Sequence, residues 1–170
     1  MNWEAISAVS DFLAAIAVIV TLGYLAVQIR QNTSTLKSTA TQGAHDQTAA
    51  LYDLLASDSE LSEIFVRGLE APDTLDESET ARFFSLLMSA TFKMQNWYMQ
   101  TESGAIEGEL LTSWMKVIRQ LSALPGWQEF WRQRGQIFAP TFVAHLQSNV
   151  FSGERDPLYR PLGVGRQREV

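Results

Sequence analysis

An uninterrupted apolar run near the N-terminus constrains this chain more than any other feature. Residues 12–29 contain ten Leu, Ile, Val or Phe side chains, and no charged residue lies between Asp11 and Arg30. As a helix, these 18 residues would be roughly 27 Å long, close to the hydrocarbon thickness of a bilayer. The ten side chains contribute roughly −3 to −6 kcal/mol to insertion. The run therefore predicts a transmembrane anchor over residues 1–32. The alternative is a buried helix or the core of an oligomer.

The flanks of the run distinguish an anchor from a secretory signal. A signal peptide begins with basic residues, whereas the charges ahead of this run are Glu4 and Asp11. Arg30 and Lys37 follow the run, and positive charges favour the cytoplasmic side of a membrane. We therefore expect a single-pass protein with its N-terminus outside and its C-terminal domain in the cytoplasm.

Small and weakly polar residues share one face of the predicted anchor. Their spacings are three, four and seven, and they are Ser7, Ser10, Ala14, Ala17, Thr21 and Gln28. Transmembrane helices associate through close backbone approach at small residues and through hydrogen bonds from Ser, Thr and Gln. This face predicts self-association of the helix or, in a larger assembly, the lining of a pore. The alternative is an ordinary anchor that tolerates these residues.

Helical periodicity continues through the remaining sequence. On one face, residues repeat at intervals of three and four, as in a core helix of a bundle: Phe83, Leu87, Ala90, Met94 and Trp97. No segment alternates apolar and polar residues over the length of a strand, and no Asn-Gly or Asp-Gly turn is present. The chain is therefore predicted to be all-α, with the N-terminal transmembrane helix followed by an antiparallel helical bundle.

Three regions follow from these patterns: the anchor, a cytoplasmic bundle over residues 33–151, and a flexible tail over residues 152–170. The tail lacks helical periodicity and is rich in Arg, Gly and Pro. We expect Leu158 and Tyr159 to hold it against a neighbouring surface. Between anchor and bundle, the sequence is compatible both with one continuous helix and with a break near Asn32.

Capping residues predict where two helices of the bundle begin. Ser57 is followed three residues later by Glu60, and Thr74 by Glu77. Each pair has the spacing of a capping box, in which the two side chains bind each other's backbone N–H groups. Helices are therefore expected to start after Ser57 and after Thr74.

Acidic residues dominate the segment 53–79, which contains nine carboxylates and one basic residue, Arg67. Most such carboxylates are solvated or lie near helix N-termini. The alternatives are a docking surface for a basic protein partner or a vestibule that attracts cations. The net charge of −6 argues against nucleic acid as a partner.

Aromatic and basic residues are densest near residue 130. Trp127, Trp131 and Arg134 share one helical face, at spacings of four and three. The guanidinium can therefore lie over an indole or pair with a carboxylate. One interpretation is a helix corner whose aromatic side chains fill the core while Arg134 pairs with Glu107 or Glu109. The alternative is a partner surface or small-ligand pocket formed by these three residues.

The sequence contains no catalytic or metal-binding pattern. There is no Cys, and His45 and His145 have no ligand partner at helical spacing. A glycine-rich phosphate loop, a nucleophile elbow and a HisGluXXHis motif are also missing. We therefore predict no enzymatic activity, no cofactor and no metal. An enzyme built on this sequence would have to use carboxylates such as Glu107 and Glu109.

Three stretches resemble a widespread family of small bacterial proteins. They are the opening MetAsnTrpGluAlaIle, the LeuGlyTyrLeuAlaValGlnIleArgGlnAsnThr that ends the apolar run, and TrpGlnGluPheTrp with the later IlePheAlaProThrPhe. Members of that family are single-pass, N-terminally anchored and predicted all-helical, with no established activity. The resemblance implies the bacterial inner membrane.

Together these observations predict a membrane-anchored helical interaction or scaffold protein. We expect it to contact membrane lipid and to self-associate through the N-terminal helix. The alternative is a homo-oligomeric channel or pore lined by the small and polar face of that helix.

Overall fold

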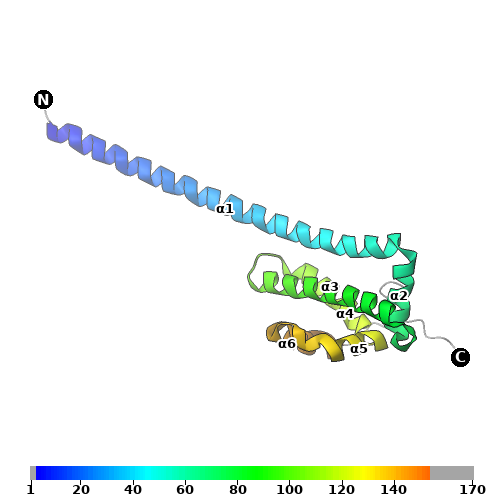
Figure 1. Ribbon diagram of the computed structural model, residues 1–170. Coiled ribbons are helices and arrows are strands. Elements are labelled where there is room, and N and C mark those ends of the chain that lie inside the picture. The colour runs from blue at the N-terminus through cyan, green and yellow to red at the C-terminus, as the bar shows by residue number, and fades with distance from the viewer. Residues whose placement is uncertain (1–2, 154–170) are drawn as a thin grey trace. The chain divides into compact units, whose positions relative to one another are not determined.

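A computed structural model describes residues 3–153 of the chain (Figure 1). Helix accounts for 89% of the structure, and the described residues contain no strand. The all-α prediction is therefore confirmed. The predicted tail contacts of Leu158 and Tyr159 lie outside the described residues.

Helix α1 (Trp3–Ser57) is continuous, so the structure contains the uninterrupted helix and not the break near Asn32. The chain divides into two compact units, residues 1–40 and 41–170, and α1 belongs to both. The remaining elements are α2 (Ser59–Glu70), η1 (Pro72–Thr74), α3 (Glu77–Glu102), α4 (Gly108–Leu121), α5 (Pro125–Arg134), η2 (Gly135–Ile137), α6 (Pro140–Leu146) and the π-helix η3 (Gln147–Phe151).

Both predicted capping boxes are wrong by one or two residues. Helix α1 extends to Ser57, whose hydroxyl donates to the Leu54 carbonyl, so Asp58 caps α2 by accepting from the Leu61 N–H. Thr74 closes the short helix η1, where its hydroxyl donates to the Ala71 carbonyl.

The capping box of α3 is formed by Asp76 and Glu79. The Asp76 carboxylate accepts from the Glu79 N–H at 2.8 Å, and the Glu79 carboxylate accepts from the Asp76 N–H at 3.0 Å. Ser57 and Thr74 have hydrogen bonds within the preceding helical turn, which leaves the next acidic residue to cap each helix.

Helix α3 is the centre of the second unit, because it packs against α2, α4, α5 and α6. Its predicted inner face is confirmed at four of five positions, since Phe83, Leu87, Met94 and Trp97 are buried and Ala90 is half-buried. The helix ends at Glu102, and the turn that follows contains Gly104 with a φ of 70°. That left-handed conformation favours glycine.

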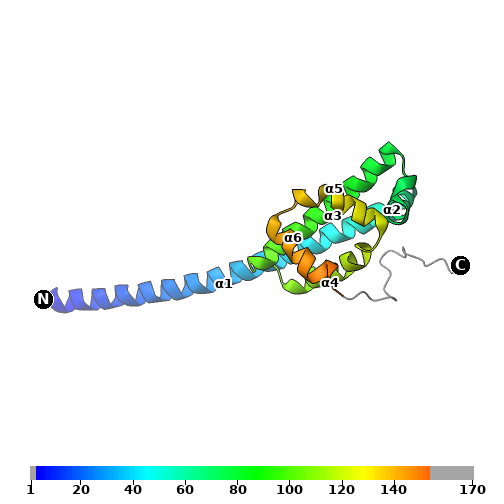
Figure 2. The same ribbon diagram turned by 90° about the horizontal axis from the view of Figure 1, so that it is seen from below.

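The last part of α1, from residue 41, also belongs to this unit (Figure 2). Ala44 is buried, and the Trp114 Nε1 on α4 donates to the Thr48 hydroxyl at 3.2 Å. The rings of Trp114 and Tyr52 lie 6.2 Å apart. The domain core therefore includes the C-terminal turns of α1.

A close backbone approach joins α2 to the start of α5. A Cβ placed on Gly126 would lie 1.9 Å from the carbonyl oxygen of Gly68. A Cβ on Gly68 would lie 2.7 Å from the ring of Phe83. Both glycines are buried. Helices α2 and α5 can pack at this separation only without a side chain at Gly126, whereas the lack of one at Gly68 leaves room for the Phe83 ring on α3.

We expect Gly126→Ala to destabilise the domain strongly. The new methyl group meets backbone atoms that cannot rotate away, and overpacking of this kind costs about 1–3 kcal/mol or more. Urea denaturation of the full-length protein in detergent, followed by tryptophan fluorescence, measures the loss.

Gly43→Ala is the matched control, because a Cβ at Gly43 in α1 meets no atom within 4 Å. It should be neutral or stabilising by up to about 1 kcal/mol, the helix preference of alanine over glycine. Equal denaturation midpoints for Gly126→Ala and Gly43→Ala would contradict this account of the α2–α5 contact.

Candidate functional site

The first candidate surface is the apolar part of α1. From Val9 to Ile29 its large apolar side chains are between 42% and 68% exposed. By length and composition this helix is able to cross a membrane, and no part of its apolar window is buried. An apolar helix in the core of a soluble domain would instead be mostly covered by protein.

The predicted association face lies on this exposed part of α1. All six of its residues are exposed: Ser7, Ser10, Ala14, Ala17, Thr21 and Gln28. The Thr21 hydroxyl donates to the Ala17 carbonyl at 2.8 Å, and the Gln28 Nε2 donates to the Tyr24 hydroxyl at 2.8 Å. These donors therefore have partners within the helix, which lowers the cost of placing them in hydrocarbon.

The predicted partner surface at α5 is divided by the fold. Trp127 is only 1% exposed, Trp131 is half-buried, and Arg134 is exposed. The indoles of Trp127 and Trp131 are stacked at 11° with centroids 6.4 Å apart, and Trp131 also stacks on Phe138. The first interpretation, in which aromatic side chains fill a helix corner, describes Trp127 well.

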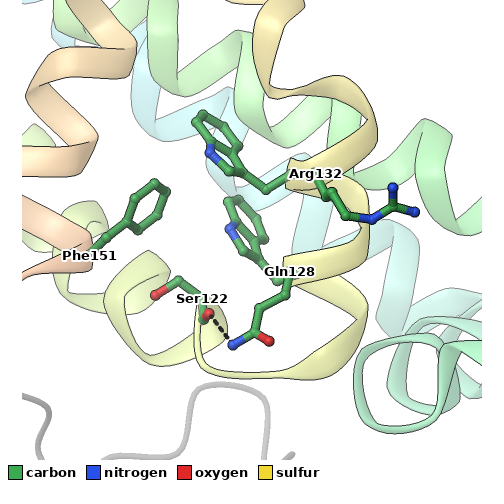
Figure 3. Close-up of a pocket in the computed structure, with 6 residues that line it drawn as sticks. Ser122, Gln128, Arg132 and Phe151 are labelled. Atoms are coloured by element: carbon green, nitrogen blue, oxygen red, sulfur yellow. Dashed lines mark hydrogen bonds between the residues drawn. The ribbon is translucent and has the colours of Figure 1, made fainter.

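Trp127 and Trp131 line a cavity of about 350 Å³ (Figure 3). The other lining residues come from the turn after α4, from α5 and from η3: Ser122, Gln128, Arg132 and Phe151. The Phe151 ring stands edge-on to Trp131, with centroids 5.3 Å apart. The cavity is therefore predominantly aromatic, with polar side chains at its margin.

Arg134 lines a different depression, of about 670 Å³, between α3 and the end of α5. Phe84, Met88 and Ile137 supply its apolar lining, and Glu77 is also part of it. Within the described residues, Glu107 and Glu109 are exposed and no ion pair joins them to Arg134.

The acidic segment 53–79 is partly neutralised by arginines. Arg67 pairs with Glu79, and Arg82 pairs with both Glu60 and Asp58. Beside these pairs, an open groove of about 830 Å³ lies between the end of α1 and α2, lined by residues that include Glu63 and Arg67. The surface is thus acidic but contains internal ion pairs, each worth little at the surface.

The two histidines have different surroundings. His45 is exposed on α1, whereas His145 is half-buried with its ring 4.8 Å from that of Tyr98. Among the described residues, no group of three or more His, Asp or Glu side chains is arranged to hold a metal ion. The arrangement therefore offers surfaces and cavities for binding, and the prediction of no enzymatic activity stays a prediction.

Sequence reasoning identified Trp127 and Trp131 but missed the rest of the cavity. Ser122, Gln128 and Phe151 carry no motif, and Phe151 is separated from Trp131 by twenty residues. Only the three-dimensional packing brings these side chains together.

Comparison with known proteins found no match to a protein-family model, to a curated protein or to a solved structure.

The ion pair between the half-buried Glu129 and the exposed Arg132, which lines the cavity, makes the stability of the domain depend on pH. Arg132 and Gln133 donate to the Glu129 carboxylate and lower its pKa from 4.5 to about 2. A carboxyl whose pKa is lower in the folded than in the unfolded protein stabilises the fold at pH values above its unfolded-state pKa. This stabilisation is lost as the pH falls towards the folded-state pKa. The contribution of Glu129 to the free energy of unfolding should therefore be constant above pH 5 and disappear between about pH 4.5 and 2.

We expect the stability difference between wild type and Glu129→Gln to shrink over that interval and to stay constant from pH 5 to 8. Urea denaturation at a series of pH values measures it. The double variant Glu129→Gln with Arg132→Gln is the control and should show no greater pH-dependence than Glu129→Gln alone. A difference that grows as the pH falls would show that the sign is wrong.

Proposed function

We propose that this chain is a membrane-anchored helical interaction or scaffold protein. The observation that supports it is the exposure of the large apolar side chains from Val9 to Ile29 on all sides of α1. Soluble monomers rarely expose contiguous apolar patches larger than a few hundred Å². A bilayer covers such a helix on every side.

In this proposal the hydrocarbon core surrounds α1 between Asp11 and Arg30. Insertion of the ten large apolar residues contributes about −3 to −6 kcal/mol. The basic residues Arg30 and Lys37 favour the cytoplasmic side, which leaves the N-terminus outside. The resemblance to small anchored bacterial proteins favours the inner membrane as the location.

The domain from residue 41 onward is the part that presents interaction surfaces in the cytoplasm. We propose that its helices form an antiparallel bundle around α3. The short connections, such as the one between Glu102 and Gly108, and the packing of α3 against four other helices support this arrangement. The acidic segment 53–79 is the proposed docking surface for a basic protein partner.

Self-association through α1 is the second part of the proposal. The face from Ser7 to Gln28 is exposed and carries small side chains that permit close approach of two backbones. Thr21 and Gln28 have intrahelical partners, so association would depend chiefly on packing at Ala14 and Ala17. A channel lined by the same face is the alternative, and it requires a larger assembly.

The stoichiometry of the full-length protein in lipid nanodiscs, measured by native mass spectrometry, tests this part. We expect a defined oligomer. Ala17→Leu should weaken association at least tenfold, because the larger side chain separates the helices. Ala15→Leu is the matched control, because Ala15 lies on a different face of the same helix. It should leave the oligomer intact.

A monomer at every protein concentration would contradict self-association and leave residues 1–40 as a tether. A ring-sized oligomer that conducts ions in a planar bilayer would favour the channel. A defined oligomer that conducts no current, even with Thr21→Gly in the proposed face, favours the scaffold.

A further inference from the structure

The depression between α3 and the end of α5 combines an apolar lining with one charged residue of each sign. Phe84 and Met88 are half-buried in it, and Ile137 is 51% exposed. Its charged residues are Glu77 and Arg134. In the part of the chain that the structure describes, no ion pair or side-chain hydrogen bond engages either of them. Both charges are therefore available to an outside partner.

Two aromatic pairs show how α5 and the turn after it run along α3. The rings of Phe84 and Phe130 lie 5.6 Å apart, and those of Phe92 and Phe138 lie 5.1 Å apart. The later residue of each segment thus faces the later residue of the other. The chain from α5 to the end of η2 therefore runs alongside α3 in the same direction.

The two charges lie at opposite ends of the depression. Arg134 is midway between the two phenylalanines of its segment, as Met88 is on α3, so these two residues lie level with each other. Glu77 is the first residue of α3 and precedes Met88 by eleven residues. That is about 16 Å along a helix. This separation explains why the carboxylate and the guanidinium do not pair within one copy.

We propose that this depression is an interface between two copies of the chain, related by a twofold axis. A rotation of 180° places Arg134 of each copy beside Glu77 of the other, with the apolar lining between the two ion pairs. A surface of a single charge sign would instead select a partner of the opposite sign. A surface with one charge of each sign at its ends is complementary to its own copy.

Small residues at the centre of the depression fit this interface. Ala81 and Ser85 are exposed on α3 between the levels of the two charges, and they allow two α3 helices to approach each other. The contact also covers the exposed side chain of Ile137. The inference goes beyond the association proposed for α1, because all of these residues belong to the second unit and the contact does not require α1 to associate.

Cross-linking between copies of the full-length protein in membranes tests this interface. The chain has no Cys, so Ala81→Cys introduces a single thiol at the centre of the depression. We expect a short bis-maleimide to join two copies at least tenfold faster than in the control Ser113→Cys, whose thiol lies on the exposed surface of α4. Equal rates for the two variants would overturn the proposal.

Charge reversal in the Ala81→Cys protein tests the pairing itself. Arg134→Glu and Glu77→Arg, each expressed alone, should reduce the cross-link at least tenfold, because like charges then face each other. Co-expression of the two variants should restore it to within twofold, since both contacts between the two different chains again pair opposite charges. A variant that merely fails to fold is not restored by its counterpart. An unchanged cross-link in either single variant, or no recovery on co-expression, would overturn the proposal.

Discussion

The exposed apolar surface of α1 is the constraint on which the rest of this account depends. Val9 to Ile29 expose large aliphatic side chains around the whole circumference of α1. Water makes such a surface unfavourable by roughly 25 cal/mol per Å². The polar side chains within the run do not oppose insertion strongly, because Thr21 and Gln28 already have hydrogen-bond partners within the helix. We propose lipid as the environment that fits both facts.

The second unit has its own core. Trp127, Phe83 and Phe130 are almost completely buried there. The contact of Gly68 with Gly126 sets the separation of α2 and α5, and thereby the position of the two indoles that line the aromatic cavity. This unit presents acidic and aromatic surfaces, which the proposed scaffold function requires.

Periodicity was the reliable part of sequence interpretation, because a helix in a core must repeat its apolar face. It located the inner face of α3 correctly, from Phe83 to Trp97. Helix starts were less predictable, since Ser57 and Thr74 each bind a carbonyl of the preceding turn and the cap shifts to an aspartate.

The aromatic cavity was only half predictable. Spacing placed Trp127 and Trp131 on one face, but the fold buries Trp127 and leaves Arg134 in another depression. Phe151 and Ser122 join the indoles through packing between elements distant in sequence, which no local pattern records.

The accessibility of single cysteines in α1 tests the membrane assignment most directly. The chain has no native Cys, so Ser7→Cys, Ala17→Cys and Ser38→Cys each carry one thiol. In intact spheroplasts, a membrane-impermeant maleimide should label position 7, label position 38 only after lysis, and label position 17 only after detergent is added. Equal labelling of all three positions in a soluble fraction would contradict a membrane-spanning α1.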